Sequence, residues 1–123
     1  MQRTTLSLSA INLFHNVAMA FYVIEYRYSQ ELRNLVNDFR PAHRNYLREL
    51  ESQGKLISSG FLLDAAYDGA MLIVRAETST EALNLLDEDP FRLNDLIEDV
   101  SARRWIPTIG VHADEFDVEF PIS

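Results

Sequence analysis

Strand-like and helix-like patterns follow one another along this chain in the order strand, helix, strand, strand, helix, strand, and this order restricts the fold more than any other feature. The strand patterns are rich in β-branched and aromatic residues, and the helix patterns repeat apolar residues at helical spacing. We expect strands at residues 21–27, 55–63, 70–76 and 103–109, and helices at residues 41–53 and 78–88. The order is that of the ferredoxin-like α+β fold, β-α-β-β-α-β, with an antiparallel sheet and both helices on one face.

Local signals mark the expected ends of the helices. Pro41 suits the first position of a helix, where no backbone N–H is needed, and Gly54 suits a helix stop. The stretch Thr78 to Glu81 matches a capping box, which predicts a helix start. Asp89-Pro90 then ends or re-caps this helix, and Leu93 to Val100 is expected to form a second short helical segment.

Size and composition fit a single globular domain. The chain has 123 residues, of which 47% are hydrophobic and 24% charged. We assign the domain to residues 20–111. Residues 1–19 are interpreted as an N-terminal extension or as the product of a misassigned start. The acidic tail, residues 112–123, is expected to pack as an extended arm on the domain or on a partner, because apolar and acidic residues alternate in it at Phe116, Val118 and Phe120.

Composition also argues against several classes of function. The net charge of -8, from 19 Asp and Glu against 11 Lys and Arg, has the wrong sign for binding nucleic acid. The chain has no cysteine, its three histidines lack metal-ligand spacing, and no glycine-rich phosphate loop is present. No apolar run approaches the roughly 20 residues that span a bilayer. We therefore expect a cytoplasmic protein with no cofactor, no metal, and neither nucleic acid nor membrane as a partner.

The expected topology brings acid–base groups to one end of the sheet. The start of the first helix, the end of the second helix and the turn after the second strand all lie at that end. His43, Asp89 and Asp64 occupy these three positions and could therefore converge. In the first turn of a helix, His43 would lie near exposed amides and the positive end of the helix dipole, which favours the neutral imidazole.

Three motifs, in this order, resemble the YCII-related (YciI-like) family over residues 20–109: Arg40-Pro41-Ala42-His43, residues 54–60 and Asp89-Pro90-Phe91. The resemblance implies a small bacterial ferredoxin-like domain that forms a dimeric, α/β-barrel-like assembly, with a site built around a histidine and an aspartate. One characterised relative eliminates chloride from a chlorinated hydroxyquinol. This chain has Gly60-Phe61 where the family commonly has Gly-Pro.

The resemblance assigns the family histidine to His43 and its aspartate to Asp89, with Asp64 as the alternative acid. The carboxylate would fix the imidazole tautomer, leaving the other ring nitrogen to exchange a proton with the substrate. Arg40 could hold a carboxylate or enolate oxygen of the substrate, and Ser59 could donate to an oxyanion. Two simpler interpretations stay open: Asp89 as a helix cap, and Arg40 as a surface cation paired with nearby acids.

These residues predict a cofactor-free lyase or isomerase that transfers protons on, or eliminates a group from, a small anionic or phenolic metabolite. The alternative is a non-catalytic domain that binds or senses a small molecule in the same pocket. We also expect a homodimer, because a four-stranded sheet with helices on one face leaves its other face to be covered.

Overall fold

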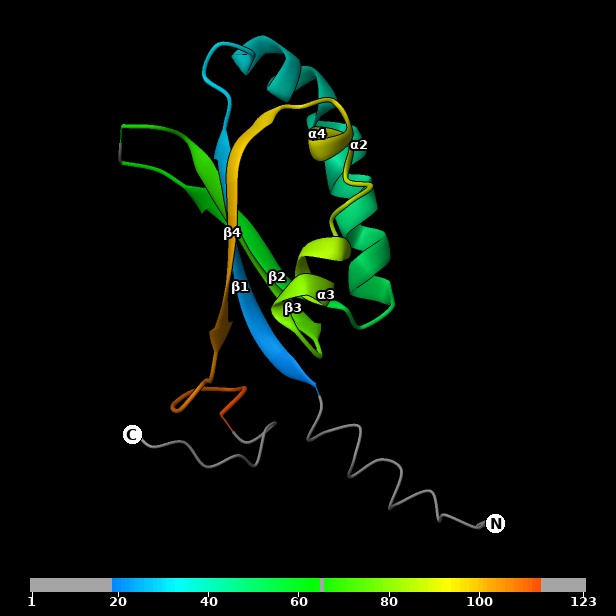
Figure 1. Cartoon of the computed structure of the whole chain (residues 1–123), viewed down its shortest axis with the longest axis vertical. Helices are drawn as coiled ribbons and strands as arrows, with labels where there is room; N and C mark the ends of the chain where they lie inside the picture. Colours follow the sequence, from blue (N-terminus) through cyan, green and yellow to red (C-terminus); the bar gives the residue numbers. More distant parts are fainter. Residues whose placement is uncertain (1–18, 65, 114–123) are drawn as a thin grey trace.

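The structure, a computed structural model, describes residues 19–64 and 66–113, so the expectations for the N-terminal extension up to residue 18 and for Phe116, Val118 and Phe120 lie outside the described residues. An antiparallel sheet in the order β2-β3-β1-β4 carries the helices on one face (Figure 1). The elements are β1 Ala20–Tyr28, α2 Arg33–Ser52, β2 Leu56–Leu62, β3 Gly69–Ala76, α3 Ser79–Asn84, α4 Pro90–Leu93 and β4 Ile97–Trp105. The predicted ferredoxin-like α+β fold is confirmed. Within the described ranges, no helix is both long and apolar enough to cross a membrane.

The core lies between the sheet and the helices. β1 is central and pairs antiparallel with both β3 and β4. Because side chains alternate along a strand, β1 turns Tyr22, Ile24, Tyr26 and Tyr28 towards the helices, and all four are buried in the core. Helix α2 covers this face with a set of buried residues: Val36, His43, Leu47 and Leu50.

The expected start of the first helix at Pro41 is wrong. Helix α2 begins eight residues earlier, at Arg33, and Pro41 lies inside it on the exposed side. Proline inside a helix removes a backbone hydrogen bond, which favours bending, and α2 changes direction along its length (Figure 1). The helix continues through Pro41 because Val36, ahead of the proline, packs into the same core as the residues that follow it. His43 is therefore in mid-helix, and the expected influence of a helix N-terminus on it does not apply.

The second half of the chain differs from expectation in two places. Thr78 caps α3 as predicted, accepting a hydrogen bond from the Glu81 N–H at 3.1 Å, but α3 ends at Asn84 rather than near residue 88. The helical segment expected at residues 93–100 is wrong, because α4 ends at Leu93 and β4 runs over Ile97–Trp105 rather than over residues 103–109. β4 has these bounds because it pairs with residues 21–28 of β1. A bulge shifts the register between Arg27 and Tyr28, so the side chains at the start of β4 do not follow the simple alternation of a strand.

Gly69 provides a stability test, because its backbone is packed directly against β1. A Cβ at Gly69 would lie 2.2 Å from the Tyr26 carbonyl oxygen, whereas a Cβ at Gly60 in the neighbouring strand would meet nothing within 4 Å. We expect Gly69→Ala to lower the free energy of unfolding by about 2–3 kcal/mol, the upper part of the range for overpacking. Gly60→Ala is the matched control, and urea unfolding measures both. Equal stabilities of the two variants would contradict the packing described.

Candidate active site

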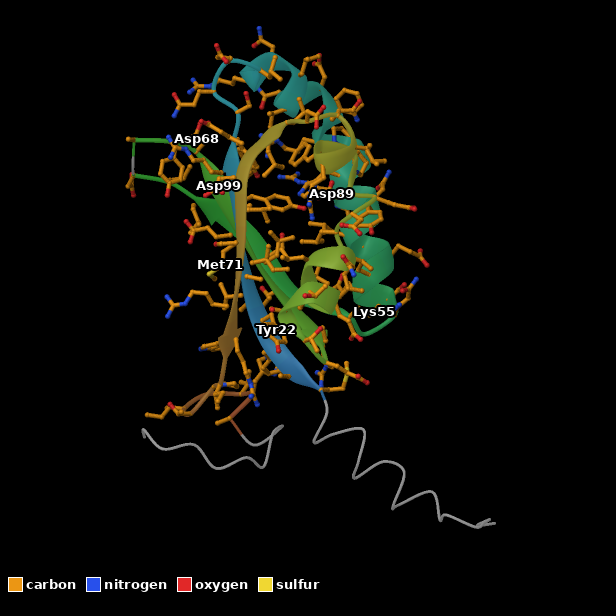
Figure 2. The ribbon with its side chains drawn as sticks, viewed as in Figure 1. Tyr22, Lys55, Asp68, Met71, Asp89 and Asp99 are labelled. Atoms are coloured by element: carbon orange, nitrogen blue, oxygen red, sulfur yellow. The ribbon has the colours of Figure 1, made fainter. Side chains whose placement is uncertain are left out.

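His43 and Asp89, which are 46 residues apart in sequence, form a buried pair. The His43 Nδ1 atom lies 2.9 Å from both carboxylate oxygens of Asp89. His43 is 5% exposed and Asp89 is fully buried. Asp89 occupies the layer between the sheet and α2 (Figure 2). The topology predicted that the start of the first helix and the end of the second lie at one end of the sheet; His43 and Asp89 do meet, although His43 is in mid-helix rather than at a helix start.

Three donors surround the Asp89 carboxylate. Besides His43, the Tyr26 hydroxyl donates to Oδ2 at 2.7 Å, and the Phe91 backbone N–H donates to Oδ1 at 3.0 Å. The Phe91 contact makes Asp89 the N-cap of α4, so the helix-cap interpretation and the pairing with His43 both hold. A buried carboxylate is tolerated when its oxygens are fully hydrogen-bonded. These three donors therefore favour an ionised Asp89 that accepts the His43 Nδ1–H.

The His43 ring is fixed in orientation as well as in hydrogen bonding. The Phe91 ring stacks on it with a centroid distance of 4.0 Å and an interplanar angle of 8°. Tyr28 in turn packs edge-on against Phe91, with centroids 5.5 Å apart. The ring can therefore act without reorienting.

The second ring nitrogen of His43, Nε2, has no hydrogen-bond partner in the described part of the chain and is not a fully buried atom. His43 lines a small cavity of about 100 Å³, called here the inner cavity. Its other walls come from α2, β1, β2 and β3: Tyr28, Arg40, Arg44, Leu47, Ser59, Gly60, Phe61 and Ala70. A carboxylate-held imidazole thus lines a space that a small ligand could enter.

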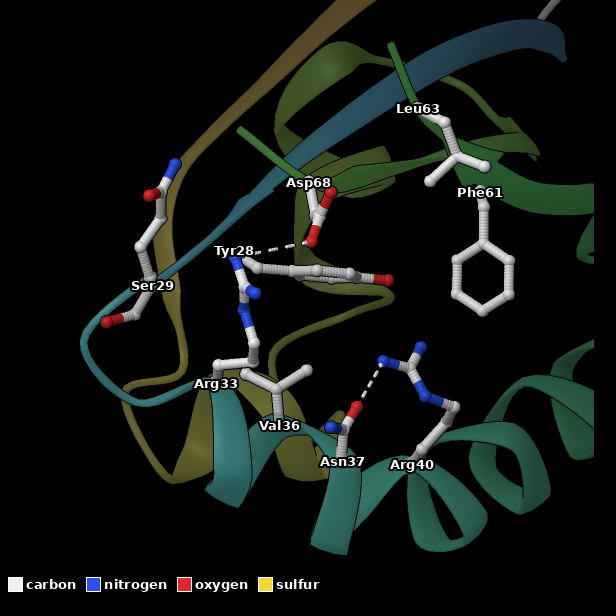
Figure 3. Close-up of a pocket in the computed structure, with 10 residues that line it drawn as sticks. Tyr28, Ser29, Arg33, Val36, Asn37, Arg40, Phe61, Leu63 and Asp68 are labelled. Atoms are coloured by element: carbon white, nitrogen blue, oxygen red, sulfur yellow. Dashed lines mark hydrogen bonds and ion pairs between the residues drawn. The ribbon is translucent and has the colours of Figure 1, made fainter. Parts of the chain in front are cut away.

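A larger cavity of about 390 Å³, called here the outer cavity, lies beside the inner one. Tyr28, Arg40 and Phe61 line both, so the two cavities meet at these side chains. Figure 3 shows Arg40 and Phe61 facing each other across the space, with the Tyr28 ring on a third side. The outer cavity itself does not include His43 among its lining residues.

Two arginines, Arg40 and Arg44, place positive charge in the walls of the inner cavity that His43 lines. Arg40 donates to the Asn37 amide oxygen at 3.1 Å, and its guanidinium lies 4.8 Å from the Phe61 ring centroid. Arg44, one helical turn further on, lies 5.8 Å from the same ring. Neither arginine forms an ion pair with an acidic side chain among the described residues. Arg40 is thus not the acid-paired surface cation of the simpler interpretation, and both guanidinium groups are available to an anionic ligand.

The tyrosines around the site are kept protonated. Burial raises the pKa of Tyr26 far above its usual value, and the neighbouring Asp89 charge raises this pKa further. Burial likewise raises the pKa of Tyr28, although the Arg40 guanidinium opposes the shift. Burial first, and then the Asp89 charge, also raises the pKa of Tyr46, whose hydroxyl donates to the Leu85 carbonyl oxygen. At neutral pH these hydroxyls are therefore hydrogen-bond donors, as the contact from Tyr26 to Asp89 requires.

The other two sequence-predicted site residues have different surroundings. Asp64 is exposed in the turn after β2, with a left-handed φ of 69°. The carboxylate that contacts the His43 Nδ1 atom is that of Asp89. Ser59 is exposed on β2 and lines the inner cavity together with His43 and Arg40. The structure thus brings together His43, its partner Asp89, Arg40 and Ser59. Asp64 lies in the turn after β2 and is not among the residues that line either cavity.

Sequence reasoning missed three contributors to the site. Tyr26 falls within the strand expected at residues 21–27, but no sequence signal linked it to the acid; its place on the buried face of β1 directs its hydroxyl to Asp89. Phe91 belongs to the Asp-Pro-aromatic motif but was given no role. Arg44 lies four residues after Arg40, a spacing that places two side chains on one helix face and could have identified it.

No group of three or more His, Cys, Asp or Glu side chains that could hold a metal ion occurs in residues 19–64 and 66–113. Fold and site together define a small ferredoxin-like domain with a buried His–Asp pair beside a cavity. The model of the YCII-related domain matches residues 19–106, and the chain belongs to this family. This confirms the family that the three sequence motifs indicate.

Solved structures with the same fold include one with a known reaction. The 5-chloro-2-hydroxyhydroquinone dehydrochlorinase of Burkholderia phenoliruptrix, solved in complex with 2,5-dihydroxybenzoquinone, is 25% identical, with a TM-score of 0.60 over 69% of this chain and 92% of that one. A dimeric ferredoxin-like protein of unknown function from Thermobifida fusca is 17% identical, with a TM-score of 0.40 over 72% of this chain and 91% of that one. No protein of curated function matches the sequence.

Proposed function

We propose that this protein is a lyase or isomerase that moves a proton on a small anionic or phenolic metabolite, with His43 and Asp89 as its acid–base pair. The observation that carries the proposal is the arrangement of His43: a buried carboxylate holds Nδ1, Nε2 has no partner among the described residues, and the side chain lines a cavity that two arginines also line. This is the arrangement that general acid–base catalysis by an imidazole requires. The proposed reaction needs no cofactor.

In the proposed reaction His43 Nε2 removes a proton from a carbon or hydroxyl of the substrate. The Asp89 carboxylate stabilises the imidazolium that forms, without itself accepting the proton. The electron pair left behind is delocalised onto a ring or enolate oxygen, where Arg40 and Arg44 stabilise the negative charge. In an elimination this pair forms a new double bond while the leaving group departs as an anion. In an isomerisation the imidazolium returns the proton to another atom of the substrate.

The likeness to the dehydrochlorinase supports a ring substrate. That enzyme is named for a chlorinated hydroxyhydroquinone and was solved with a dihydroxybenzoquinone, both of which are oxygenated six-membered rings. In this chain the aromatic side chains of Tyr28 and Phe61 line the inner cavity together with two cations. Such walls suit the reacting edge of a flat ring that carries an acidic oxygen. Ser59, on the same wall, is proposed to donate to this oxygen.

The test is turnover by the wild type and by single variants, with 5-chloro-2-hydroxyhydroquinone as the first probe, followed by other hydroxylated rings, with products identified by NMR. We expect His43→Ala and Asp89→Asn each to lower kcat by about 10²–10⁴-fold, because each removes the general base or its orienting carboxylate. Arg40→Ala is expected to raise KM for anionic substrates. Arg48→Ala is the matched control, because Arg48 lies on the same helix, is exposed and, among the described residues, bonds only to Asn45.

Full turnover in both the His43 and the Asp89 variant would contradict the proposed acid–base pair. Circular dichroism of each variant separates lost chemistry from lost folding, which matters because both side chains are buried. If the wild type binds such rings at saturation and converts none of them, the alternative of a non-catalytic binding domain replaces the proposal.

We further propose that the protein forms a homodimer through the sheet face that carries no helix (Figure 1). Met71 is 39% exposed and Trp105 is 37% exposed on this face, and Val23 and Ile73 are only partly buried there. Covering them would remove apolar surface from water. Sedimentation velocity at micromolar concentration is expected to give a dimer for the wild type and a monomer for Ile73→Asp. A monomeric wild type would contradict this arrangement.

A further inference from the structure

The outer cavity has no role in the proton transfer described above. We propose that it is a second subsite of the same active site, which takes an uncharged, apolar group of about one aromatic ring, while the anionic head of the substrate lies at Arg40 beside His43. The inference rests on the proposed function and extends it, because it specifies a substrate larger than a single ring.

The volumes of the two cavities support a ligand in two parts. The inner cavity holds about 100 Å³, less than the roughly 150 Å³ of an engineered protein cavity that binds benzene. It therefore has room for the reacting edge of the head ring, and the rest of that ring extends past Tyr28, Arg40 and Phe61 into the outer cavity. The outer cavity, at about 390 Å³, is within the usual range of roughly 300–1,000 Å³ for small-molecule sites. Since the cavities share Tyr28, Arg40 and Phe61, one ligand can occupy both.

The walls of the outer cavity determine which chemical group fits it. Val36, Leu63 and the rings of Tyr28 and Phe61 form apolar walls (Figure 3). Leu63 is 65% exposed and Phe61 is 52% exposed, so a ligand that covers them removes apolar surface from water.

The charges at the rim of the outer cavity balance each other. Arg33 and Asp68 are opposite in sign and form an ion pair at 3.8 Å, with both side chains more than half exposed. Such a pair offers no net charge to a ligand and contributes little by itself. The unbalanced positive charge is instead at Arg40, where the two cavities meet. The ligand is therefore expected to be anionic at its inner end and apolar at its outer end.

The experiment compares the affinity of two probes by isothermal titration calorimetry with the full chain. The probes are 2,5-dihydroxybenzoquinone, which has one ring, and its 3-phenyl derivative, which adds an apolar ring to the same head. We expect the phenyl derivative to bind at least about tenfold more tightly, because its added ring becomes buried in the outer cavity. Affinities that are equal within twofold, or no binding of the phenyl derivative, would overturn the inference.

A filled outer cavity provides the matched variant. Asn37→Trp places a large side chain in the outer cavity, where Asn37 accepts a hydrogen bond from Arg40. Asn45→Trp is the control, because Asn45 is an exposed residue of the same helix that accepts an equivalent bond from Arg48 and lines neither cavity. We expect Asn37→Trp to abolish the preference for the phenyl probe and Asn45→Trp to preserve it. A preference that persists in Asn37→Trp would overturn the inference.

The ratio of the two affinities separates this inference from the proposed function. Any effect of Asn37→Trp on Arg40 weakens the common head of both probes and cancels in the ratio. If His43→Ala loses turnover while the wild type shows no phenyl preference, only the subsite is overturned. If the preference behaves as expected but no substrate is converted, the subsite stands and the acid–base reaction is overturned.

Discussion

The hydrogen bonding of the Asp89 carboxylate is the interaction on which the rest of the site depends. This single buried group accepts from the Tyr26 hydroxyl on β1, from His43 on α2 and from the Phe91 N–H at the start of α4. It thereby ties the centre of the sheet to both helical segments that cover this end of it. Removing one partner from a buried, hydrogen-bonded charge costs about 3–5 kcal/mol in stability. The same contacts that orient the histidine therefore also hold the local fold together.

This arrangement gives the two nitrogens of His43 different environments. Nδ1 lies against a carboxylate that also accepts from Tyr26 and Phe91, while Nε2 has no partner among the described residues and the His43 side chain lines the inner cavity. The stacked Phe91 ring keeps the imidazole plane fixed between these environments. The positive charge of Arg40 and Arg44 lies on the ligand side, where an anion would enter. The negative charge on one side of the imidazole thus comes from Asp89 at the start of α4, and the positive charge on the other side comes from the arginines of α2.

Much of this architecture was predictable from local sequence signals. The β-branched and aromatic pattern of β1 and the cap at Thr78 located their elements, because each depends on a few neighbouring residues. Topology then predicted that His43 and Asp89 could meet. The extent of α2 was not predictable in this way, because packing of Val36 on the sheet outweighs the tendency of Pro41 to interrupt a helix. The register of β4 likewise depends on pairing with β1, which no local pattern around residues 93–100 reveals.

The most direct test of the central claim is the tautomer of His43, measured by long-range ¹H–¹⁵N NMR of the labelled imidazole at a pH where the ring is neutral, with His43→Asn used for assignment. The account predicts a proton on Nδ1 and a bare Nε2 in the wild type, because Asp89 accepts from Nδ1. It predicts a change to the Nε2–H form in Asp89→Asn, where an amide N–H faces the ring instead of a second carboxylate oxygen. A wild-type ring protonated on Nε2, or a tautomer that Asp89→Asn leaves unchanged, would contradict the acid–base role assigned to the pair.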